Sequence, residues 1–162
     1  MKAKDLMVPL VDYLRPYSTL KEAASLLRTA RRSEKRIGVK ALPVLDDHGS
    51  LVGILSIGDI LKAVYPSYLY LMDLGEFTWD GMVESFAKKM SDRKVSDLMT
   101  QSVITVHEES SLMECVDHML KNGVKRVPVM SREGAVVGMI YERDVFYEIT
   151  RSMLDRHAKE GA

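Results

Sequence analysis

The chain has 162 residues, of which 46% are hydrophobic and 28% charged, a composition typical of a globular protein with one domain or two small ones. Lys+Arg and Asp+Glu both number 23, so the formal net charge is zero, which argues against a nucleic-acid-binding protein with its basic surface. The single cysteine, Cys115, excludes an internal disulfide and a cysteine-based metal cluster. We see no signal peptide and no apolar stretch near the roughly 20 residues that a membrane span needs. We therefore expect a cytoplasmic protein without membrane insertion.

The sequence contains an internal repeat. Asp5-Leu6-Met7 recurs as Asp97-Leu98-Met99 and Ser18-Thr19-Leu20 recurs as Ser110-Ser111-Leu112, both 92 residues later. Three further landmarks recur at an offset of 85 residues: Pro43-Val44 and Pro128-Val129, Val52-Gly53 and Val137-Gly138, and Asp59 and Asp144. The offset falls because the first copy carries seven additional residues between its first helix and its Pro-Val strand. Landmarks in one order, with one length change, indicate a duplicated structural unit.

Each repeat is predicted to begin with a short strand and a helix. Thr19 and Glu22 have the spacing of a capping box, in which two side chains satisfy backbone N–H groups at a helix start, and Ser111 and Glu114 repeat it. The apolar residues that follow have helical spacing. They are Leu20, Ala23, Ala24 and Leu27 in the first repeat, and Leu112, Cys115, Val116 and Met119 in the second. Gly123 is well placed to end the second helix.

A β-hairpin and a second helix are expected next in each repeat. Short β-branched runs flank a polar turn with glycine, which is the hairpin pattern. These runs are Leu42–Leu45 with Leu51–Leu55, and Val127–Met130 with Ala135–Ile140. Pro43 and Pro128 lack a backbone N–H, so we expect them at strand starts or edges. The final helices are predicted to begin near Ser56 and Tyr141.

The segment between the repeats has its own composition. It holds six of the eleven aromatic residues: Tyr65, Tyr68, Tyr70, Phe77, Trp79 and Phe86. Trp79 to Met90 is predicted to be helical, with Met82, Val83, Phe86 and Met90 on one side. The segment is either a connector packed on the core or a dimer-contact element, since aromatic and Met residues are enriched in interfaces.

The repeated landmarks resemble the cystathionine-β-synthase-type (CBS) domain, present as a tandem pair. The residues that carry the resemblance are Asp-Leu-Met before the first strand, Ser/Thr-x-Leu at the helix start, Pro-Val in the hairpin, and Gly-x-x-Ser-x-x-Asp at its exit. The resemblance implies an α/β (α+β) fold, a pseudo-twofold pair of β-α-β-β-α units packed through their sheets. We place repeat 1 at 1–64, the helical connector at 65–93, repeat 2 at 94–150 and a tail at 151–162.

The same resemblance implies a ligand cleft between the repeats that takes an adenosine-containing molecule: AMP, ADP, ATP or S-adenosylmethionine. In physical terms, the Asp59 carboxylate can accept hydrogen bonds from ribose hydroxyls, while the Ser56 hydroxyl and helix N–H groups can meet phosphate oxygens. Ser56 and Asp59 also have the spacing of a simple capping pair. Carried over from the family, the first expected site consists of Ser56, Asp59, Ser102, Val103, Ile104, Arg126, Val127 and Pro128. Val103 and Val127 are expected to sandwich the adenine ring.

The second cleft departs from the family pattern. Its expected residues are Leu10, Val11, Leu42, Pro43, Tyr141, Arg143 and Asp144. Tyr141 replaces the small hydroxyl residue and fills phosphate space, and Asp12 would repel a phosphate, with Arg143 and Lys40 as partial compensation. We therefore predict one good site and one degenerate or differently selective site.

The seven-residue insertion brings a basic run, Arg28, Arg31, Arg32, Lys35, Arg36 and Lys40. It is either a solvated helix end and loop or a phosphate-gathering arm at the cleft.

Two functions are compatible with these patterns. The first is a regulatory module that senses an adenosine ligand, as in energy sensing, and transmits a conformational change to an unknown protein partner. The second is a protein-interaction or dimerisation module without a physiological ligand; a homodimer is expected in either case. An enzyme is not expected, because the four histidines lack metal-ligand spacing and no catalytic motif occurs. No metal and no cofactor other than the adenosine ligand is expected.

Overall fold

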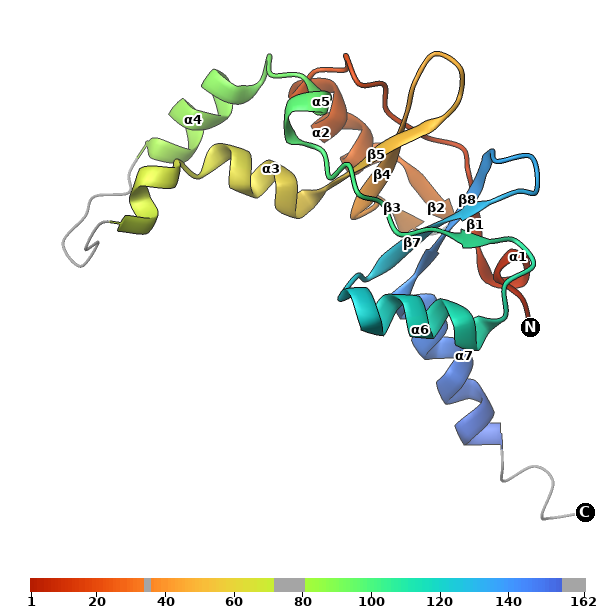
Figure 1. The fold of residues 1–162 in the computed structure, drawn as a ribbon. Helices are drawn as coiled ribbons and strands as arrows, with labels where there is room; N and C mark the ends of the chain where they lie inside the picture. The colour runs from red at the N-terminus through yellow and green to blue at the C-terminus, as the bar shows by residue number, and fades with distance from the viewer. Residues whose placement is uncertain (34–35, 72–80, 156–162) are drawn as a thin grey trace, which may run out of the picture. The chain divides into compact units, whose positions relative to one another are not determined.

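The computed structural model describes residues 1–33, 36–71 and 81–155 and shows a mixed α/β fold (Figure 1). The chain divides into two compact units, Asp12–Val103 and a second that joins Met1–Val11 to Ile104–Ala162. The chain passes between units after Val11 and again after Val103, which are equivalent positions 92 residues apart. Each repeat therefore gives its opening segment to the unit that holds the other repeat's hairpin. The repeat boundaries read from the sequence remain a prediction, and the compact units follow a different division.

The unit that joins the N-terminus to the second repeat has one four-stranded sheet. Its elements are α1 (Ala3–Leu6), β1 (Val8–Pro9), β6 (Val106–His107), α6 (Leu112–Asn122), β7 (Arg126–Met130), β8 (Val136–Tyr141) and α7 (Glu142–Leu154). The strand order is β1-β8-β7-β6, with β6 parallel to β7 and the other pairs antiparallel. Helices α6 and α7 supply Cys115, Met119 and Val145 to a core that also holds Val127, Val129 and Ile140 from the hairpin.

The unit Asp12–Val103 is built on the first repeat's hairpin. Its elements are α2 (Leu20–Thr29), β2 (Arg31–Ser33), β3 (Arg36–Ile37), β4 (Ala41–Leu45), β5 (Leu51–Ser56), α3 (Ile57–Val64), the 3₁₀ helix η1 (Ser67–Leu71), α4 (Met82–Met90) and α5 (Val95–Leu98). Strand β4 pairs with β5, and β2 pairs with β3 within the insertion. The core gathers Leu20, Ala23 and Leu27 of α2 around Val44 and Leu55 of the hairpin, with Val95 of α5.

Backbone pairing follows the duplication residue by residue. Val8 pairs with Met139 in one unit, and Thr100 pairs with Ile54 in the other. Thr100 lies 92 residues after Val8, and Met139 lies 85 residues after Ile54, so the two pairs are equivalent. The bridges Leu14–Val44 and Thr19–Lys94 likewise repeat the Val106–Val129 and Lys2–Ser111 pairs. The internal repeat predicted from the sequence is thus present in the hydrogen-bonded structure.

The repeated Val-Gly landmark has a steric cause. A Cβ built on Gly138 would lie 2.7 Å from the Val8 backbone oxygen and 2.8 Å from the Met7 sulfur. A Cβ on Gly53 would lie 2.5 Å from the Met99 sulfur and 3.0 Å from the Thr100 backbone oxygen. The glycines therefore leave room for the exchanged Asp-Leu-Met segments, which pack over β5 and β8.

Most helix boundaries agree with the prediction. Thr19 and Glu22 form the full capping box of α2, the Ser111 hydroxyl accepts from the Glu114 N–H, and Gly123 ends α6 in the left-handed conformation with φ 62°. The final helices begin after Ser56 and Tyr141, as expected.

The expectation for the two prolines is confirmed in its second form. Pro43 and Pro128 each occupy the third position of their strand rather than its start. Both lie at an edge, since β4 is an edge strand of the two-stranded β4–β5 sheet and the pairing of β6 with β7 begins only at Val129, after Pro128. Ser102, Val103 and Ile104 belong to no strand and lie between the isolated Thr100–Ile54 bridge and β6, which begins at Val106.

The connector contains η1 and α4, and α4 packs beside α3 (Figure 1). Met82, Phe86 and Met90 of α4 are half-buried, whereas Val83, which we expected on the same side, is 66% exposed. Phe77 and Trp79 lie outside the described residues. Within η1 and its approach, the rings of Tyr65 and Tyr70 meet edge to face at 4.9 Å.

The capping box of α2 gives a first testable prediction. Thr19→Ala removes the hydroxyl that accepts from the Glu22 N–H, so the free energy of unfolding should fall by about 1 kcal/mol. Ser25→Ala, at an exposed position within the same helix, should change it by a few tenths at most. Urea denaturation followed by circular dichroism measures both, and equal midpoints for the two variants would contradict the capping role.

Candidate ligand-binding site

The candidate site is centred on the start of α3, where β5 passes directly into the helix. Ser56 is the N-cap, with φ −110° and ψ 164°, and its hydroxyl accepts from the Asp59 N–H at 3.3 Å. In return, Asp59 Oδ2 accepts from the Ser56 N–H at 2.8 Å and from the Ser56 hydroxyl at 3.0 Å. The pair is therefore a capping box, and its geometry fixes the direction of the Asp59 carboxylate.

This capping box leaves hydrogen-bonding groups unused at the same point. All three bonds of the Asp59 carboxylate and N–H involve Oδ2 or the Ser56 hydroxyl, and within the described residues Oδ1 accepts none. The Ile57 N–H donates to the Lys40 carbonyl at 2.9 Å, whereas the Gly58 N–H donates to no group in the described part of the chain. Gly58 is exposed and Asp59 is half-buried, so among the described residues an anionic acceptor and a backbone donor are left unpaired at a helix N-terminus.

Ser102 and Val103, two expected residues of the first site, belong to the same unit as Ser56 and Asp59. They follow Thr100, whose backbone exchanges two hydrogen bonds with Ile54 of β5 at 2.9 and 3.0 Å. Ser102 is exposed and Val103 is half-buried.

Ile104, Arg126, Val127 and Pro128 belong to the other unit. Arg126 is half-buried and pairs with Tyr141 across β7 and β8, while Val127 and Pro128 are fully buried. The Val127 side chain lies in the core with Val129 and Ile140, so it is already committed to packing. That these residues join Ser56 and Asp59 in one site stays a prediction.

The start of α7 differs from that of α3, as the sequence indicated. Tyr141 is only 8% exposed and provides no side-chain cap, in contrast to Ser56. Arg143 donates to the Tyr147 hydroxyl at 3.1 Å and lies 5.4 Å from the centre of that ring. Of the other residues expected in the second site, Leu42 and Pro43 are buried in β4, and Leu10 extends the β1–β8 pairing through its N–H to the Val137 carbonyl.

Sequence reasoning missed one feature of the first site. Lys40 was assigned to the second cleft, but its carbonyl receives the first N–H of α3, and the carbonyl of Lys125 receives the equivalent N–H of Glu142 in α7. The sequence could have indicated that the two lysines are equivalent, because Lys40 and Lys125 are 85 residues apart and each precedes a hairpin strand. Lys40 is exposed beside Ser56, because the following residue, Ala41, pairs with Ser56.

The described part of the chain offers no second candidate site of a different chemistry. Within the described residues, no cluster of three His, Cys, Asp or Glu side chains could hold a metal ion. Cys115 is fully buried, and burial raises the pKa of its thiol, which keeps it in the less reactive protonated form. None of the helices in ranges 1–33, 36–71 and 81–155 combines the length and apolarity needed to cross a membrane.

The duplication, the exchanged segments and the helix-start sites lead to a family. The CBS domain model matches this sequence twice, over residues 3–66 and 95–151. The chain belongs to the CBS domain family. The two matches make it a tandem CBS pair, as the sequence landmarks suggested.

Two curated relatives resemble the chain over most of its length. The uncharacterized protein MJ1426 of Methanocaldococcus jannaschii is 32% identical over 120 residues, which cover 66% of this chain and 71% of that protein. The chloroplastic CBS domain-containing protein CBSX2 of Arabidopsis thaliana is 28% identical over 150 residues, and the matched region spans 60% of its length.

Solved CBS pairs share the fold. The crystal structure of CBSX2 in complex with AMP superimposes with a TM-score of 0.65 at 24% identity, covering 94% of this chain and 98% of that one. The CBS domain pair of protein MJ0100, in complex with 5′-methylthioadenosine and S-adenosylmethionine, gives a TM-score of 0.64 at 23% identity over 94% and 98% of the two chains. At this level of identity the likeness establishes the α/β fold of the pair.

Proposed function

We propose that this CBS pair is a non-enzymatic regulatory module that binds an adenosine-containing ligand, AMP, ADP, ATP or S-adenosylmethionine, and transmits the binding to a partner protein. The observation that carries the proposal is the start of α3, where Asp59 Oδ1 and the Gly58 N–H are left without partners among the described residues. Two solved CBS pairs, one in complex with AMP and the other with 5′-methylthioadenosine and S-adenosylmethionine, support the ligand class.

The chemistry at α3 suits the ribose and phosphate parts of such a ligand. A carboxylate oxygen can accept hydrogen bonds from ribose hydroxyls, and charge-assisted bonds of this kind are about twice as strong as neutral ones. The Gly58 N–H at the positive end of the helix dipole can donate to a phosphate oxygen, and the Lys40 ammonium can approach from the neighbouring strand. We further propose that Ser102, Val103, Ile104, Arg126, Val127 and Pro128 complete this site. Val127 would contribute its backbone, because its side chain is in the core.

Regulation requires that the ligand bind two conformations of the protein with different affinity. Because the two CBS repeats exchange their opening segments, a ligand held at α3 lies in a unit to which both repeats contribute residues. The ligand would shift the balance between two arrangements of the chain, and a partner would bind one of them. We propose the cytoplasm as the place of this regulation.

Calorimetric titration of nucleotide-stripped protein with AMP, ATP and S-adenosylmethionine tests the proposal. Binding of one of these ligands in the micromolar range would support it. Absence of heat for all three, at protein concentrations above the expected Kd, would refute it. The function would then be that of an interaction module, which the exposed apolar side chains Tyr70, Leu71 and Val83 of the connector favour.

The difference between the starts of α3 and α7 predicts how many adenosine ligands one chain binds. Ser56 offers a hydroxyl and leaves the helix start open, whereas Tyr141 is buried at the equivalent position. We expect one tightly bound adenosine ligand per chain, with any second site at least about tenfold weaker. Calorimetry gives the number of sites directly; two sites of equal affinity would show that Tyr141 does not impair the second.

A further inference from the structure

The segment that carries the seven-residue insertion is strongly basic, and its charge is not balanced within the segment. Residues 28–40 hold six Lys and Arg residues and one acidic residue, Glu34, which gives a formal charge of +5. The whole chain has 23 residues of each sign, so its other residues hold 17 basic and 22 acidic side chains, a formal charge of −5. We call residues 28–40 the basic segment. A local excess of one sign attracts partners of the opposite sign.

The basic segment is attached to α2 by backbone hydrogen bonds. It runs from the end of α2 through β2 and β3, which pair with each other in a two-stranded sheet of their own. Arg31 of β2 lies opposite Ile37 of β3 in the register. The N–H of Gly38, which has φ 89°, donates to the Ala30 carbonyl at 2.8 Å and so joins the end of β3 to the end of α2. Arg31 and Ile37 are therefore held in place beside α2.

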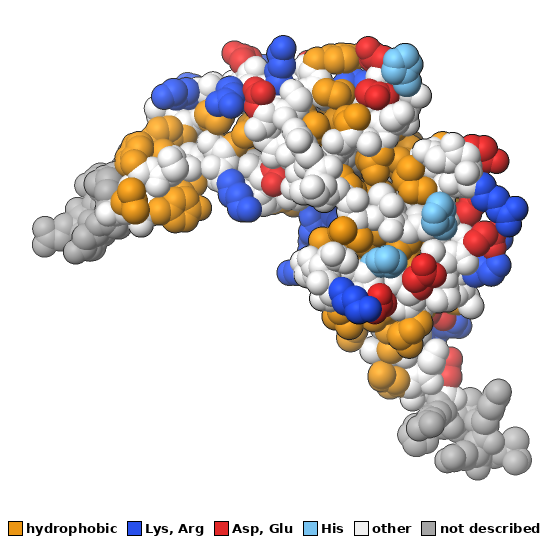
Figure 2. Space-filling model, viewed as in Figure 1, with side chains coloured by type: hydrophobic (Ala, Val, Ile, Leu, Met, Phe, Trp, Pro, Cys, Tyr) orange, Lys and Arg blue, Asp and Glu red, His pale blue; other side chains and the backbone are white. Residues whose placement is uncertain are grey.

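The basic side chains of the segment lack acidic partners. Arg28, Arg31 and Lys40 are exposed, and none of them forms an ion pair with another described residue. The unit that holds the second repeat differs, because Figure 2 shows basic and acidic side chains next to one another over α6, where Lys121 lies 2.8 Å from Asp117. The three charges of the basic segment are thus available to a partner outside the chain.

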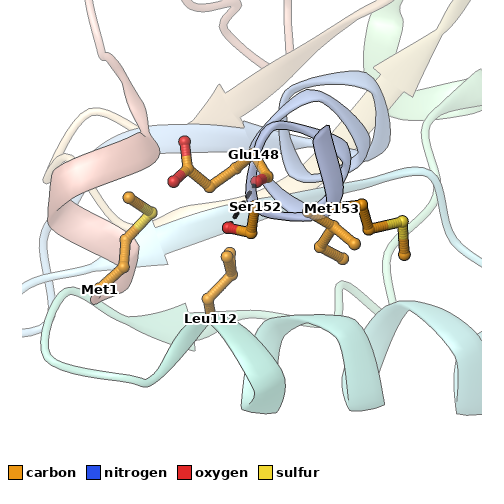
Figure 3. A pocket seen from close by; sticks show the side chains of 6 residues that line it. Met1, Leu112, Glu148, Ser152 and Met153 are labelled. Atoms are coloured by element: carbon orange, nitrogen blue, oxygen red, sulfur yellow. Dashed lines mark hydrogen bonds between the residues drawn. The ribbon is translucent and has the colours of Figure 1, made fainter. Parts of the chain in front are cut away.

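The two repeats also differ in charge at equivalent grooves. The groove between α2, α3 and α4, of about 490 Å³, is lined by Lys21 and Arg28, whereas the residues 92 positions later, Met113 and Leu120, are apolar. The groove between α6 and α7, of about 580 Å³, has no Lys or Arg among its described lining residues (Figure 3), which are Met1, Leu112, Glu148, Ile149, Ser152 and Met153. The positive charge therefore belongs to the first repeat and is not required by the repeated fold.

Ile37 indicates which kind of anionic partner fits. Its side chain is 70% exposed opposite Arg31, so the partner should present an apolar group next to its negative charges. A protein segment of Asp, Glu and apolar residues has both, whereas the backbone of a nucleic acid offers phosphates. A nucleic acid or an anionic membrane would also extend over the rest of the chain, whose charge of −5 repels it. A short protein segment meets mainly the charges within about 8 Å at physiological salt.

We infer that the basic segment binds an acidic, partly apolar segment of a partner protein. Carboxylates of that segment contact Arg28, Arg31 and Lys40, and one of its apolar side chains packs on Ile37. The Lys40 carbonyl accepts the first N–H of α3 at 2.9 Å, so the contact lies beside the candidate ligand site. The inference rests on the proposed function for the existence of a regulated partner, and it adds the chemistry of that partner.

Fluorescence anisotropy with a synthetic peptide tests the inference. The probe is a fluorescein-labelled peptide of Asp and Glu residues with two Leu residues, titrated with nucleotide-free protein at physiological ionic strength, and we expect binding in the micromolar range. Arg28→Ser with Arg31→Ser should weaken binding by about tenfold, because two charge contacts are lost. Lys88→Ser with Lys89→Ser, at exposed positions of α4, changes the net charge equally and should leave the affinity unchanged.

A further variant separates the apolar contact from the charges. Ile37→Ser should weaken binding of the Leu-containing peptide by about threefold and leave unchanged the binding of a peptide with Ser in place of Leu. An equal loss of affinity for both peptides would contradict the apolar contact.

Four other results would overturn the inference. They are absence of peptide binding, wild-type affinity in the Arg28→Ser/Arg31→Ser variant, an equal loss in the Lys88→Ser/Lys89→Ser variant, and tighter binding of oligouridine RNA or of phosphatidylserine vesicles than of the peptide. The peptide titration contains no nucleotide, and calorimetry measures binding of adenosine ligands separately. Failure of this inference and failure of the proposed ligand binding are therefore distinguishable.

Discussion

Asp59→Ala is expected to reduce the affinity for the adenosine ligand by about 100-fold, the largest effect that we predict for one side chain. The carboxylate is held by Ser56 through Oδ2, so Oδ1, which accepts no hydrogen bond within the described residues, can accept from ribose hydroxyls. Loss of a charged hydrogen-bond acceptor in a binding site costs about 1.5–3 kcal/mol, which corresponds to between tenfold and somewhat over 100-fold in Kd. Calorimetric titration with the ligand that binds the wild type measures the change.

The structure offers a matched control for this variant, because Asp59 also caps α3. Glu22 of α2 plays the same capping part toward Thr19, with its carboxylate accepting from the Thr19 N–H at 3.2 Å. Glu22→Ala should cost similar stability and leave the Kd unchanged, whereas Asp59→Asn should keep the capping shape and lose most of the affinity. If Glu22→Ala and Asp59→Ala weaken binding equally, the effect arises from helix stability, and the site assignment is wrong.

Gly138→Ala is expected to lower the free energy of unfolding by about 3 kcal/mol. Its Cβ would meet the backbone oxygen of Val8 at 2.7 Å, and backbone cannot move aside as a side-chain end can. The exchanged segment Met1–Val11 would be pushed off β8, along with its hydrogen bonds. Small domains have net stabilities of about 5–15 kcal/mol, so a loss of this size should clearly lower the midpoint of urea denaturation.

Alanine substitutions at two other glycines give comparison values for this loss of stability. Gly53→Ala should cost less, because the nearest backbone atom to its Cβ, the Thr100 oxygen, is at 3.0 Å rather than 2.7 Å, and its closer contacts are to the Met99 side chain, which can move. Gly58→Ala has no atom nearer than 3.5 Å to its new Cβ and lies in the first turn of α3, so it should be neutral or stabilise by up to about 1 kcal/mol. A Gly138→Ala variant as stable as Gly58→Ala would show that the N-terminal segment does not pack closely on β8.

The capping residues show what local sequence can predict. Thr19, Ser56, Ser111 and Gly123 act through neighbours three or four positions away, and each helix starts or ends where its pattern indicated. The connector shows the limit of the same reasoning. Val83 has the helical spacing of a buried residue, yet it is exposed, because no neighbouring element covers that side of α4 within the described residues.

The duplication, the hairpins, the helix starts, the family and the capping pair of Ser56 and Asp59 could all be predicted from the amino-acid sequence. Helix starts and hairpins depend on hydrogen bonds between neighbouring residues and on the spacing of apolar residues. In a duplicated sequence both patterns occur twice, so they are easier to recognise. Three features became visible only in the folded chain: each opening segment joins the other repeat's hairpin, Gly53 and Gly138 leave room for these segments, and the Val127 side chain packs in the core. Those outcomes depend on contacts between residues far apart in the chain, where packing and steric exclusion, which have no local signature, choose the arrangement.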